Sequence, residues 1–336
     1  MKMKNNPGSK LLISIFYLMM LTVTSCSQLV KEKPAAPDKP IILLLLKDYD
    51  NEFYRKIDEG FRSGMTPYLK NNYQLDLRYG SNESDIATQG RELKHYIADY
   101  ASAKPDSRLK IAVITPVAGN NDIATQIKPL NDDNIPIVIV DLAIDPAALA
   151  RAHSHYDVFI GSANKLGGKL AADEMAKHLP HGGTILLLNG VAGAKIAMGR
   201  ADGFVSRLTE LGKQNSADYK IIERAANYTR SEAQSIVSSL LKMGVSPDGV
   251  FAVNDQMALG CLEALRQAQY DRIVVVIGFD AIKEAVDAVK DGRLAATIVQ
   301  DPFGMGQKAA IAVDKILHHE ATDKKILLSP KLISDD

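Results

Sequence analysis

The chain has 336 residues, of which 46% are hydrophobic and 24% are charged. This length exceeds the roughly 250 to 300 residues at which a single hydrophobic core stops growing, so we expect two domains rather than one. Forty basic residues balance forty acidic ones, without a long block of either sign, which argues against nucleic acid or another polyanion as the partner.

The first 25 residues have the composition of a signal peptide. Lys2, Lys4 and Lys10 form a positive segment, and an apolar stretch follows from residue 11 to residue 23. A transmembrane helix needs about 20 apolar residues, so this shorter stretch fits a cleaved export signal better than a membrane anchor. We therefore assign residues 1–25 to a signal peptide and expect the protein to be exported.

The apolar stretch ends in Val-Thr-Ser-Cys, with the cysteine at position 26. This ending resembles the lipobox of bacterial lipoproteins, in which the signal is removed before the cysteine and the cysteine is then acylated. The resemblance implies a lipid on Cys26 that anchors the protein at a membrane, in the periplasm or at the cell surface. Residues 26–39 place prolines among lysines and alanines, and we interpret them as a tether.

From residue 41 onward, short apolar runs alternate with longer segments of helical period. This alternation predicts repeated strand-helix-strand units with parallel sheets. The predicted strands are residues 41–46, 73–78, 110–114, 137–140, 158–161, 184–188, 221–225, 249–253, 273–277 and 295–299. The predicted helices lie around residues 57–65, 86–100, 122–131, 166–178, 197–211, 231–243, 257–267, 282–290 and 306–317. This number of units predicts an α/β protein with two doubly wound lobes.

Ligands of open parallel sheets bind beyond the carboxyl ends of the strands, so the residues that follow each predicted strand are candidates for a site. These positions supply aromatic rings, amides, carboxylates and guanidinium groups, but no nucleophile paired with a base. The loop at residues 190–195 departs from phosphate-loop spacing, and no Gly-x-Ser-x-Gly motif occurs. The histidine clusters at residues 153–155 and 318–319 lack further ligands at metal-binding spacing. The sequence therefore predicts no enzyme activity, no metal site and no cofactor.

A monosaccharide has an apolar C–H face and a ring of hydroxyl groups that both donate and accept hydrogen bonds. Phe53, Tyr54, Tyr228 and Phe279 follow predicted strands and can cover such faces. Charged and amide groups at the same strand ends can bind the hydroxyl groups. Two carboxylates there could also serve glycoside hydrolysis, which the sequence alone leaves open. We predict a binding site for a small polyhydroxylated ligand.

Four segments resemble the ribose-binding protein family of periplasmic sugar-binding proteins. They read KLGGKLA at residues 165–171, VFAVNDQMALG at 250–260, IGFD at 277–280 and GRLAATIVQ at 292–300. The resemblance extends over residues 40 to 334. It implies the type I fold of periplasmic binding proteins, in which two doubly wound parallel-sheet lobes are joined by three hinge strands.

The resemblance also implies where the lobes begin and end. The expected N-terminal lobe combines residues 40–162 with 301–330, and the expected C-terminal lobe combines residues 163–300 with 331–336. The chain would cross between the lobes near Ser162, near Gln300–Asp301 and near Ser329–Lys331. A ligand would then lie between two lobes that close on it.

Family binding positions carry over to this chain one by one. In the N-terminal lobe the implied ligand contacts are Asn51, the stacking rings Phe53 and Tyr54, and the acceptor Asp141. In the C-terminal lobe and at the hinge they are Arg200, Tyr228, Asn254, the opposing stacking ring Phe279, the second carboxylate Asp280 and the hinge-side amide Gln300.

Two positions depart from the ribose-binder pattern. Lys47 replaces a small polar residue, and Leu142 stands where ribose binders have an arginine. Losing that donor would leave ribose hydroxyl groups unpaired, which costs about 1 to 3 kcal/mol per buried group. The ligand is therefore open among ribose, another pentose, a hexose, a polyol and a furanone-type molecule such as autoinducer-2 receptors of this superfamily bind.

The implied function is capture of this ligand, without chemical change, by a monomer that delivers it to the permease of an ABC importer. One alternative is a receptor that presents its closed form to a membrane sensor kinase or chemoreceptor. Another is a carbohydrate-active enzyme on the same scaffold. Repressors of the LacI type share the fold, but they begin with a helix-turn-helix where this chain has an export signal, so no nucleic-acid partner is expected.

Overall fold

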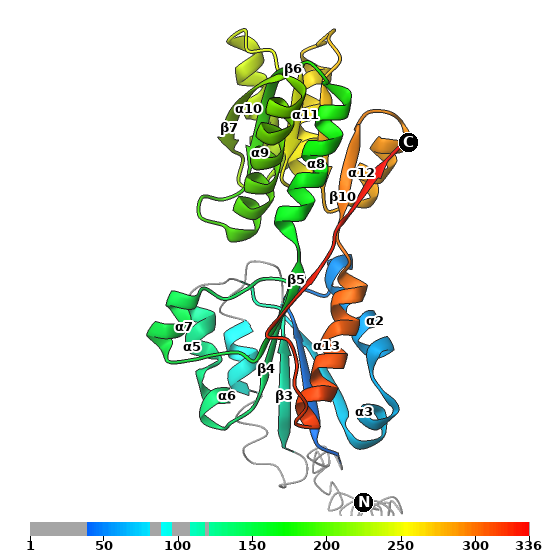
Figure 1. Ribbon diagram of the computed structural model, residues 1–336. Coiled ribbons are helices and arrows are strands. Elements are labelled where there is room, and N and C mark those ends of the chain that lie inside the picture. Colours follow the sequence, from blue (N-terminus) through cyan, green and yellow to red (C-terminus); the bar gives the residue numbers. More distant parts are fainter. Residues whose placement is uncertain (1–38, 81–88, 96–107, 118–120, 336) are drawn as a thin grey trace, which may run out of the picture. The chain divides into compact units, whose positions relative to one another are not determined.

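The computed structural model describes residues 39–80, 89–95, 108–117 and 121–335 (Figure 1). The expected signal peptide, Cys26 and nearly all of the expected tether lie outside these residues. Within them, no helix combines the length and the apolar character that a membrane crossing needs.

The first sheet has six strands, all parallel, in the order β11-β5-β4-β3-β1-β2. Its strands are β1 (Ile41–Leu46), β2 (Gln74–Tyr79), β3 (Leu109–Ile114), β4 (Ile137–Val140), β5 (Val158–Ser162) and β11 (Lys325–Leu328). Its helices are α2 (Glu52–Gly64), α3 (Pro67–Asn72), α5 (Asn121–Gln126), α6 (Lys128–Asp132), α7 (Pro146–Ala152) and α13 (Pro302–Leu317).

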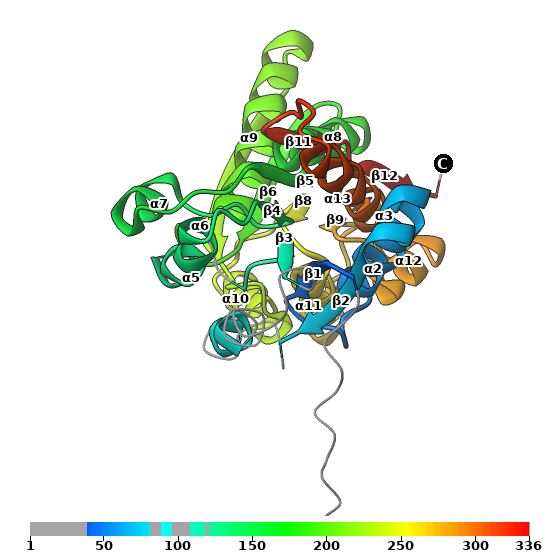
Figure 2. The same ribbon diagram turned by 90° about the horizontal axis from the view of Figure 1, so that it is seen from below.

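Strand β1 is apolar at every position because both faces of the first sheet are covered. Ile42, Leu44 and Leu46 pack with residues of α2 and α13, and the alternate residues of β1 pack with residues of α5, α6 and α7. Figures 1 and 2 both place α13 beside α2, although about 240 residues separate them in the chain. The first lobe therefore needs a helix from near the end of the chain to complete its core.

The second sheet has the strand order β12-β10-β9-β8-β6-β7. Its strands are β6 (Gly182–Asn189), β7 (Asp218–Ala225), β8 (Gly249–Ala252), β9 (Val275–Phe279), β10 (Ala296–Val299) and β12 (Lys331–Ser334). Its helices are α8 (Asn164–His178), α9 (Lys195–Asn215), α10 (Arg230–Lys242), α11 (Asp255–Gln267) and α12 (Lys283–Lys290). The strands pair in parallel, except that β12 runs antiparallel to β10.

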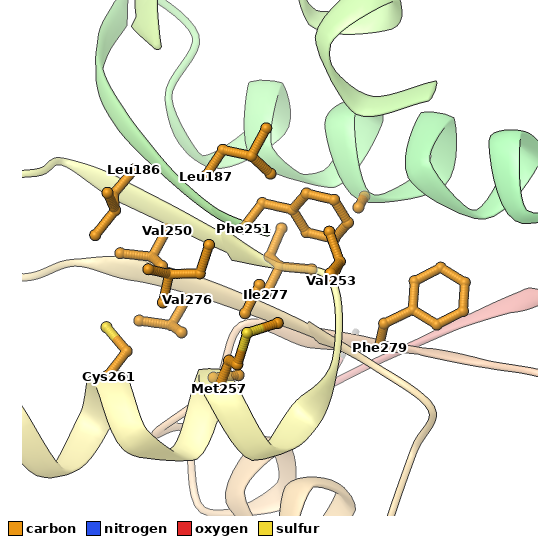
Figure 3. Close-up of a cluster of buried hydrophobic side chains, with 14 of the residues drawn as sticks. Leu186, Leu187, Val250, Phe251, Val253, Met257, Cys261, Val276, Ile277 and Phe279 are labelled. Carbon is orange, nitrogen blue, oxygen red and sulfur yellow. The ribbon is translucent and has the colours of Figure 1, made fainter. Parts of the chain in front are cut away.

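A single hydrophobic cluster fills the second lobe (Figure 3). Leu186, Val250 and Ile277 come from three adjacent strands, and the ring of Phe251 stacks on Phe204 of α9 at a centroid distance of 4.5 Å. Cys261 of α11 belongs to the same cluster, where burial raises the pKa of its thiol to about 12. Such a thiol is structural rather than reactive.

The expected two-lobed α/β fold is confirmed, with differences in detail. The helix expected at residues 122–131 is interrupted, because Pro129 lacks the N–H that a continuous helix needs, and it forms α5 and α6 instead. Strands β11 and β12 and helices α3 and α7 are additional elements. Of the helix expected at residues 86–100, residues 89–95 are helical and the others lie outside the described residues.

The chain passes between the sheets three times. It leaves β5 of the first sheet for α8, leaves β10 of the second sheet for α13, and passes from β11 to β12 through Ser329 and Pro330. The first two crossings bring Ser162 and Gln300 side by side, and the Ser162 hydroxyl donates a hydrogen bond of 2.7 Å to Gln300 Oε1.

Candidate functional site

The candidate site of the first lobe begins where β1 ends. Asn51 is the N-cap of α2, and its Oδ1 accepts a hydrogen bond of 2.9 Å from the Phe53 N–H. This cap fixes the start of the helix, so that the rings of Phe53 and Tyr54 meet edge to face with centroids 5.3 Å apart. Phe53 is half-buried and Tyr54 is buried against the core. Two of the expected aromatic residues therefore form one cluster at this strand end.

Asp141 joins the same cluster from the end of β4. Its backbone has a φ of 74°, in the left-handed region that aspartate tolerates better than most residues. Asp141 Oδ2 lies 3.4 Å from the Tyr54 hydroxyl, which donates to it. Tyr54 thus contacts both Phe53 and Asp141, which the sequence assigns to the same half of a ligand site.

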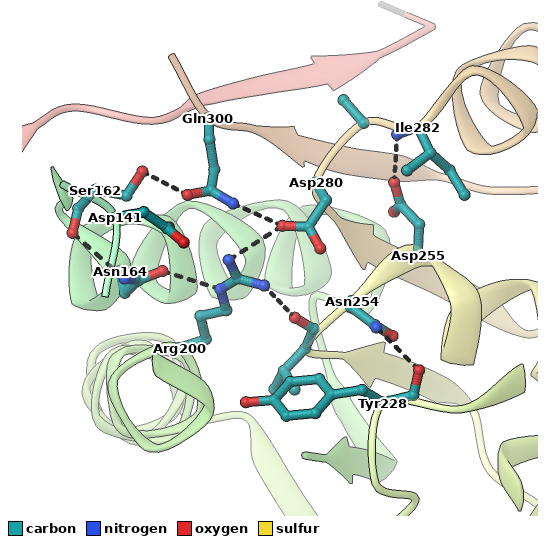
Figure 4. A network of polar contacts seen from close by, with 12 residues as sticks. Asp141, Ser162, Asn164, Arg200, Tyr228, Asn254, Asp255, Asp280, Ile282 and Gln300 are labelled. Carbon is teal, nitrogen blue, oxygen red and sulfur yellow. Dashed lines mark hydrogen bonds and ion pairs between the residues drawn. The ribbon is translucent and has the colours of Figure 1, made fainter. Parts of the chain in front are cut away.

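Arg200 is the centre of the polar network in the second lobe (Figure 4). Its side chain is buried, and three nitrogens contact three different oxygens. Nε donates to Asn164 Oδ1 at 2.9 Å, Nη1 donates to the carbonyl of Val253 at 2.7 Å, and Nη2 lies 3.0 Å from Asp280 Oδ1. A buried guanidinium held at this many points presents its remaining N–H groups in a fixed direction.

Asp280 connects Arg200 to the hinge. Gln300 Nε2 donates a hydrogen bond of 2.8 Å to Asp280 Oδ1, and Gln300 Oε1 accepts from Ser162. Asn164 Nδ2 in turn donates to the Ser162 carbonyl at 3.3 Å, which closes a ring of contacts that Figure 4 shows. The side chain of Asp280 keeps 30% of its area exposed, so it can still meet a ligand.

Tyr228 and Asn254 support each other beside this network. Asn254 is the N-cap of α11, where its Oδ1 accepts from the Met257 N–H and its Nδ2 donates to the Tyr228 carbonyl. Tyr228 has a φ of 64°, and its ring lies so close to Gly190 that a Cβ there would come within 2.3 Å of it. Burial raises the pKa of Tyr228, so its hydroxyl stays neutral near pH 7. Figure 4 shows the contact between Asn254 and the Tyr228 carbonyl.

Phe279 does not fit the stacking role that the family resemblance implies. Its side chain is fully buried, and the guanidinium carbon of Arg200 lies 3.7 Å from its ring centroid. The other neighbours include Gly167, where a Cβ would come within 2.6 Å of the ring. Strand β9 directs the Phe279 ring into the second lobe, where Arg200 covers it. The ring therefore supports the arginine instead of facing a ligand.

Lys47 and Leu142, the two departures from the ribose-binder pattern, both lie at the first-lobe site. The Lys47 N–H donates to the buried Thr115 hydroxyl at 2.6 Å, and its Nζ lies 5.7 Å from the Tyr54 ring centroid. Leu142 is half-buried beside Asp141. Lys47 therefore places a flexible ammonium group at the site, and Leu142 places an apolar side chain beside Asp141.

Sequence reasoning missed several residues that hold the site in place. Asn164 orients Arg200, and the buried Gln89 ties the loop after β3 by donating to the Thr115 carbonyl and accepting from the Val117 N–H. The buried Asp255 is a third example, next to the expected Asn254. Their signal in the sequence is weak, because amide and carboxylate side chains in loops and at helix starts usually face solvent.

Loops of the two lobes also meet at a charge pair. Lys195 Nζ, at the start of α9, lies 2.8 Å from Oδ2 of Asp145, which caps α7. Among the described residues, no group of three or more His, Cys, Asp or Glu side chains lies close enough to hold a metal ion. The chemistry on offer at the site is thus hydrogen bonding, charge and aromatic surface.

Comparisons with known proteins identify the family of the chain. A family model described as a periplasmic binding protein domain matches residues 42–321. The ribose import binding protein of Escherichia coli K12 is 34% identical over 303 residues, which cover 88% of this chain and 90% of that protein.

Solved structures show the same fold. An ABC transporter solute-binding protein from Actinobacillus succinogenes 130z, with bound D-allose, matches at a TM-score of 0.72 and 24% identity, covering 88% of this chain and 98% of that one. The fructose-binding periplasmic domain of a hybrid two-component system matches at a TM-score of 0.70 and 22% identity, covering 88% and 91%.

Proposed function

The chain belongs to the periplasmic binding protein family, and from that premise we propose that it is an exported solute-binding protein for a monosaccharide or polyol. It captures this ligand between its lobes without changing it and delivers it to the permease of an ABC importer. Its relative in Escherichia coli is a ribose import binding protein. The shared family and the arrangement of the site support the same kind of role here.

One observation carries the proposal: the Arg200–Asp280 pair is joined to the hinge amide Gln300. Arg200 donates and Asp280 accepts, so together they match the two hydrogen-bonding functions of a sugar hydroxyl group. A guanidinium has five N–H groups, and three contacts to protein oxygens leave capacity for a ligand. Phe53, Tyr54 and Tyr228 supply aromatic surface for the apolar side of the ring.

The proposed mechanism is closure around the ligand. Residues 40–162 with 301–330 would move as one lobe, and residues 163–300 with 331–336 as the other. Asn51, Phe53, Tyr54 and Asp141 contribute from the first lobe, and Arg200, Tyr228, Asn254, Asp280 and Gln300 contribute from the second lobe and the hinge. The ligand favours the closed form because only that form offers both sets of contacts.

The ligand class follows from the same residues. Lys47 adds a donor near Tyr54, while Leu142 removes the donor that ribose binders have beside Asp141. Ribose, another pentose, a hexose and a polyol are the candidates, and an autoinducer-2-like furanone is a further one. Among these candidates, we expect the ligand to be one that has a hydroxyl group within reach of the Lys47 ammonium group.

A sensing role is the second candidate. It is favoured by the structural match to a fructose-binding periplasmic domain of a two-component system. In that role the closed form would be read by a membrane sensor kinase or chemoreceptor rather than by a permease. Genes adjacent to the coding sequence distinguish the two, because an importer needs permease and ATPase genes whereas a sensor needs a kinase.

A carbohydrate-active enzyme is the least supported candidate. Asp280 is engaged by Arg200 and Gln300 in the manner of a binding residue, and no nucleophile-base pair occurs among the described site residues. We propose that the protein is not an enzyme. Recovery of the ligand unaltered after prolonged incubation is the expected result, and its turnover would contradict this view.

We further propose that the protein acts as a monomer outside the cytoplasm, held at a membrane by a lipid on Cys26. The positive segment, the apolar stretch and the Val-Thr-Ser-Cys ending support the export and the lipid anchor. The acyl chains would place the binding domain next to the membrane protein that receives the ligand.

The direct test is a thermal-shift and calorimetric screen of pentoses, hexoses and polyols. We expect one of them to raise the melting temperature of the protein. In Arg200→Ala and Asp280→Asn the affinity should fall by about 2–5 kcal/mol, or 30-fold or more, because each change leaves a charge or donor unpaired in the site.

The matched control is Arg207→Ala, since Arg207 lies on the same helix but pairs with Asp173 and Glu210 at the surface. Its affinity should equal that of the unmodified protein. Binding that is unaffected by both site substitutions would contradict the assigned site. Failure of every sugar and polyol to bind would contradict the proposed ligand class.

A further inference from the structure

Asp255 is a buried carboxyl group directly behind the proposed binding residues. It is the first residue of α11, follows the N-cap Asn254, and has only 1% of its surface exposed. A buried carboxyl group is costly unless its oxygens are satisfied, so its contacts indicate what it does.

Both oxygens of Asp255 hold the segment that carries Asp280. Oδ2 accepts a hydrogen bond of 2.8 Å from the Ile282 N–H, and Oδ1 contacts the Thr297 hydroxyl of β10 at 2.7 Å. The same hydroxyl accepts from the Ala281 N–H at 3.3 Å. Asp255 and Thr297 therefore bind the two backbone N–H groups that directly follow Asp280.

The segment that they hold has an unfavourable backbone. Asp280 has a φ of 105° and Ala281 a φ of 54°, both outside the usual range of residues with a side chain. Such conformations cost about 1–3 kcal/mol each and persist only when surrounding contacts impose them. The hydrogen bonds to Asp255 and Thr297 are contacts of this kind.

Gly278 leaves the space that Asp255 occupies. A Cβ at this position of β9 would come within 2.2 Å of Asp255 Oδ1. The carboxyl group therefore sits against the backbone two residues before Asp280, as well as against the N–H groups after it. Figure 4 shows Asp255 beside the loop that leads from Asp280 to Ile282.

We propose that Asp255 is a positioning residue for ligand binding, which holds the turn after β9 so that Asp280 faces Arg200. This inference rests on the proposed function, because it assigns Asp255 a role in the affinity of that same site. Asp255 itself does not contact the ligand.

The charges around Asp255 predict that ligand affinity depends on pH. Asp280 and Arg200 are the charged groups that face Asp255, and burial followed by the charge of Asp280 raises the pKa of Asp255 to about 8. Near pH 7 the carboxyl group is therefore mostly neutral and does not repel Asp280. As the pH rises through about 8 it ionises, and the new negative charge beside Asp280 disfavours the geometry of the turn.

The test compares Asp255→Asn with the unmodified protein between pH 7 and pH 9. The affinity of the unmodified protein for the sugar found in the screen should fall about threefold or more over this range. Asp255→Asn keeps an acceptor for Ile282 and cannot ionise, so its affinity should match at pH 7 and stay flat to pH 9. An equal pH dependence in both proteins would overturn the proposal.

Asp248→Asn is the matched control. Asp248 also accepts a backbone N–H, that of Thr184 at 2.8 Å, but it lies at the amino end of β8, away from the site. This variant should keep the pH dependence of the unmodified protein. Loss of the pH dependence in the control as well would show that the effect is not specific to Asp255 and would overturn the proposal.

A measurement without ligand separates this inference from the proposed function. Hydrogen exchange of the Ile282 amide should become about tenfold faster or more in Asp255→Ala, because its acceptor is removed, whereas Asp248→Ala should accelerate Thr184 instead. Unchanged exchange at Ile282 would overturn the positioning role whatever the protein binds. If exchange at Ile282 is faster in Asp255→Ala but the protein binds no sugar, the role of Asp255 in holding the turn stands and only the proposed ligand class is rejected.

Discussion

Arg200 is fixed by contacts on its edge and on its face. Three oxygens hold the guanidinium edge, and the ring of Phe279 covers its face at 3.7 Å. A cation over an aromatic ring gains about 0.5–2 kcal/mol, more when both groups are buried. Phe279 therefore influences binding through the position of Arg200.

Phe279→Leu should lower both the stability of the protein and its affinity for the ligand. We expect a loss of about 1–3 kcal/mol in the free energy of unfolding and a weaker affinity for the ligand, because Arg200 loses its aromatic support. Denaturant unfolding and calorimetry measure the two quantities. The control is Phe251→Leu. This change also removes a buried ring, one that stacks on Phe204 rather than on Arg200, and should lower stability with little change in affinity.

The roles of single residues were only partly predictable. Asp280 ends a segment that resembles a known family, and Arg200 carries over as a binding position of that family although it lies outside the four resembling segments. The inward direction of Phe279 was not predictable, because the predicted strand ended at residue 277, whereas β9 continues to Phe279 and is buried on both faces. Asp255 was missed since only tertiary contacts reveal that an acidic residue at a helix start is buried.

At the scale of elements, the position of α9 decides where Arg200 lies. Helices α8 and α9 pack closely through glycines: a Cβ at Gly168 would come within 2.0 Å of the Arg200 carbonyl oxygen, and one at Gly203 within 2.1 Å of the Lys165 carbonyl oxygen. The two backbones approach this closely only because neither residue has a side chain.

Gly168→Ala should therefore push α9 away from α8. We expect a loss of about 1–3 kcal/mol in stability, as for overpacked cores, together with a reduced affinity because Arg200 moves with its helix. Gly199→Ala is the control, since a Cβ there meets nothing nearer than 3.4 Å. That change should leave affinity intact and stability equal or slightly higher, and equal losses in both variants would contradict the role of the close contact.

The elements that sequence patterns predict well are those with buried, continuous signals. Strand β1 is apolar throughout and its bounds agree with the prediction, as do those of β4. Strands β11 and β12 were missed because each has only four residues and none of these residues is fully buried, so their apolar runs are weak. The break between α5 and α6 follows from Pro129. The spacing of apolar residues, from which one continuous helix was predicted, does not take the proline into account.

For the whole molecule, the resemblance of four segments was enough to predict two lobes and three crossings, and the strand orders of the two sheets agree with this topology. The antiparallel pairing of β12 with β10 was not predictable, because the direction of a strand depends on how the chain returns after Pro330. The proposed membrane attachment rests on Cys26, which lies outside the residues that the structure describes.

Cys26→Ser tests that attachment. Without the thiol no acyl chain can be added, so the protein should move from the membrane fraction to the soluble fraction after cell disruption. Immunoblotting of the two fractions measures the change. The matched control is Cys261→Ala, which removes the buried thiol and should leave the protein with the membranes. Membrane retention of Cys26→Ser would contradict the lipid anchor.

The passage from β11 to β12 has a consequence for biosynthesis. The first core includes Met305 and Val313 of α13, and each sheet takes one of its strands from β11 and β12, so neither lobe can be finished before residues 325–334 have been synthesised. Pairing of such distant segments is also slow. A precursor that folds late remains unfolded for longer, which is the state in which a polypeptide can be threaded through a membrane.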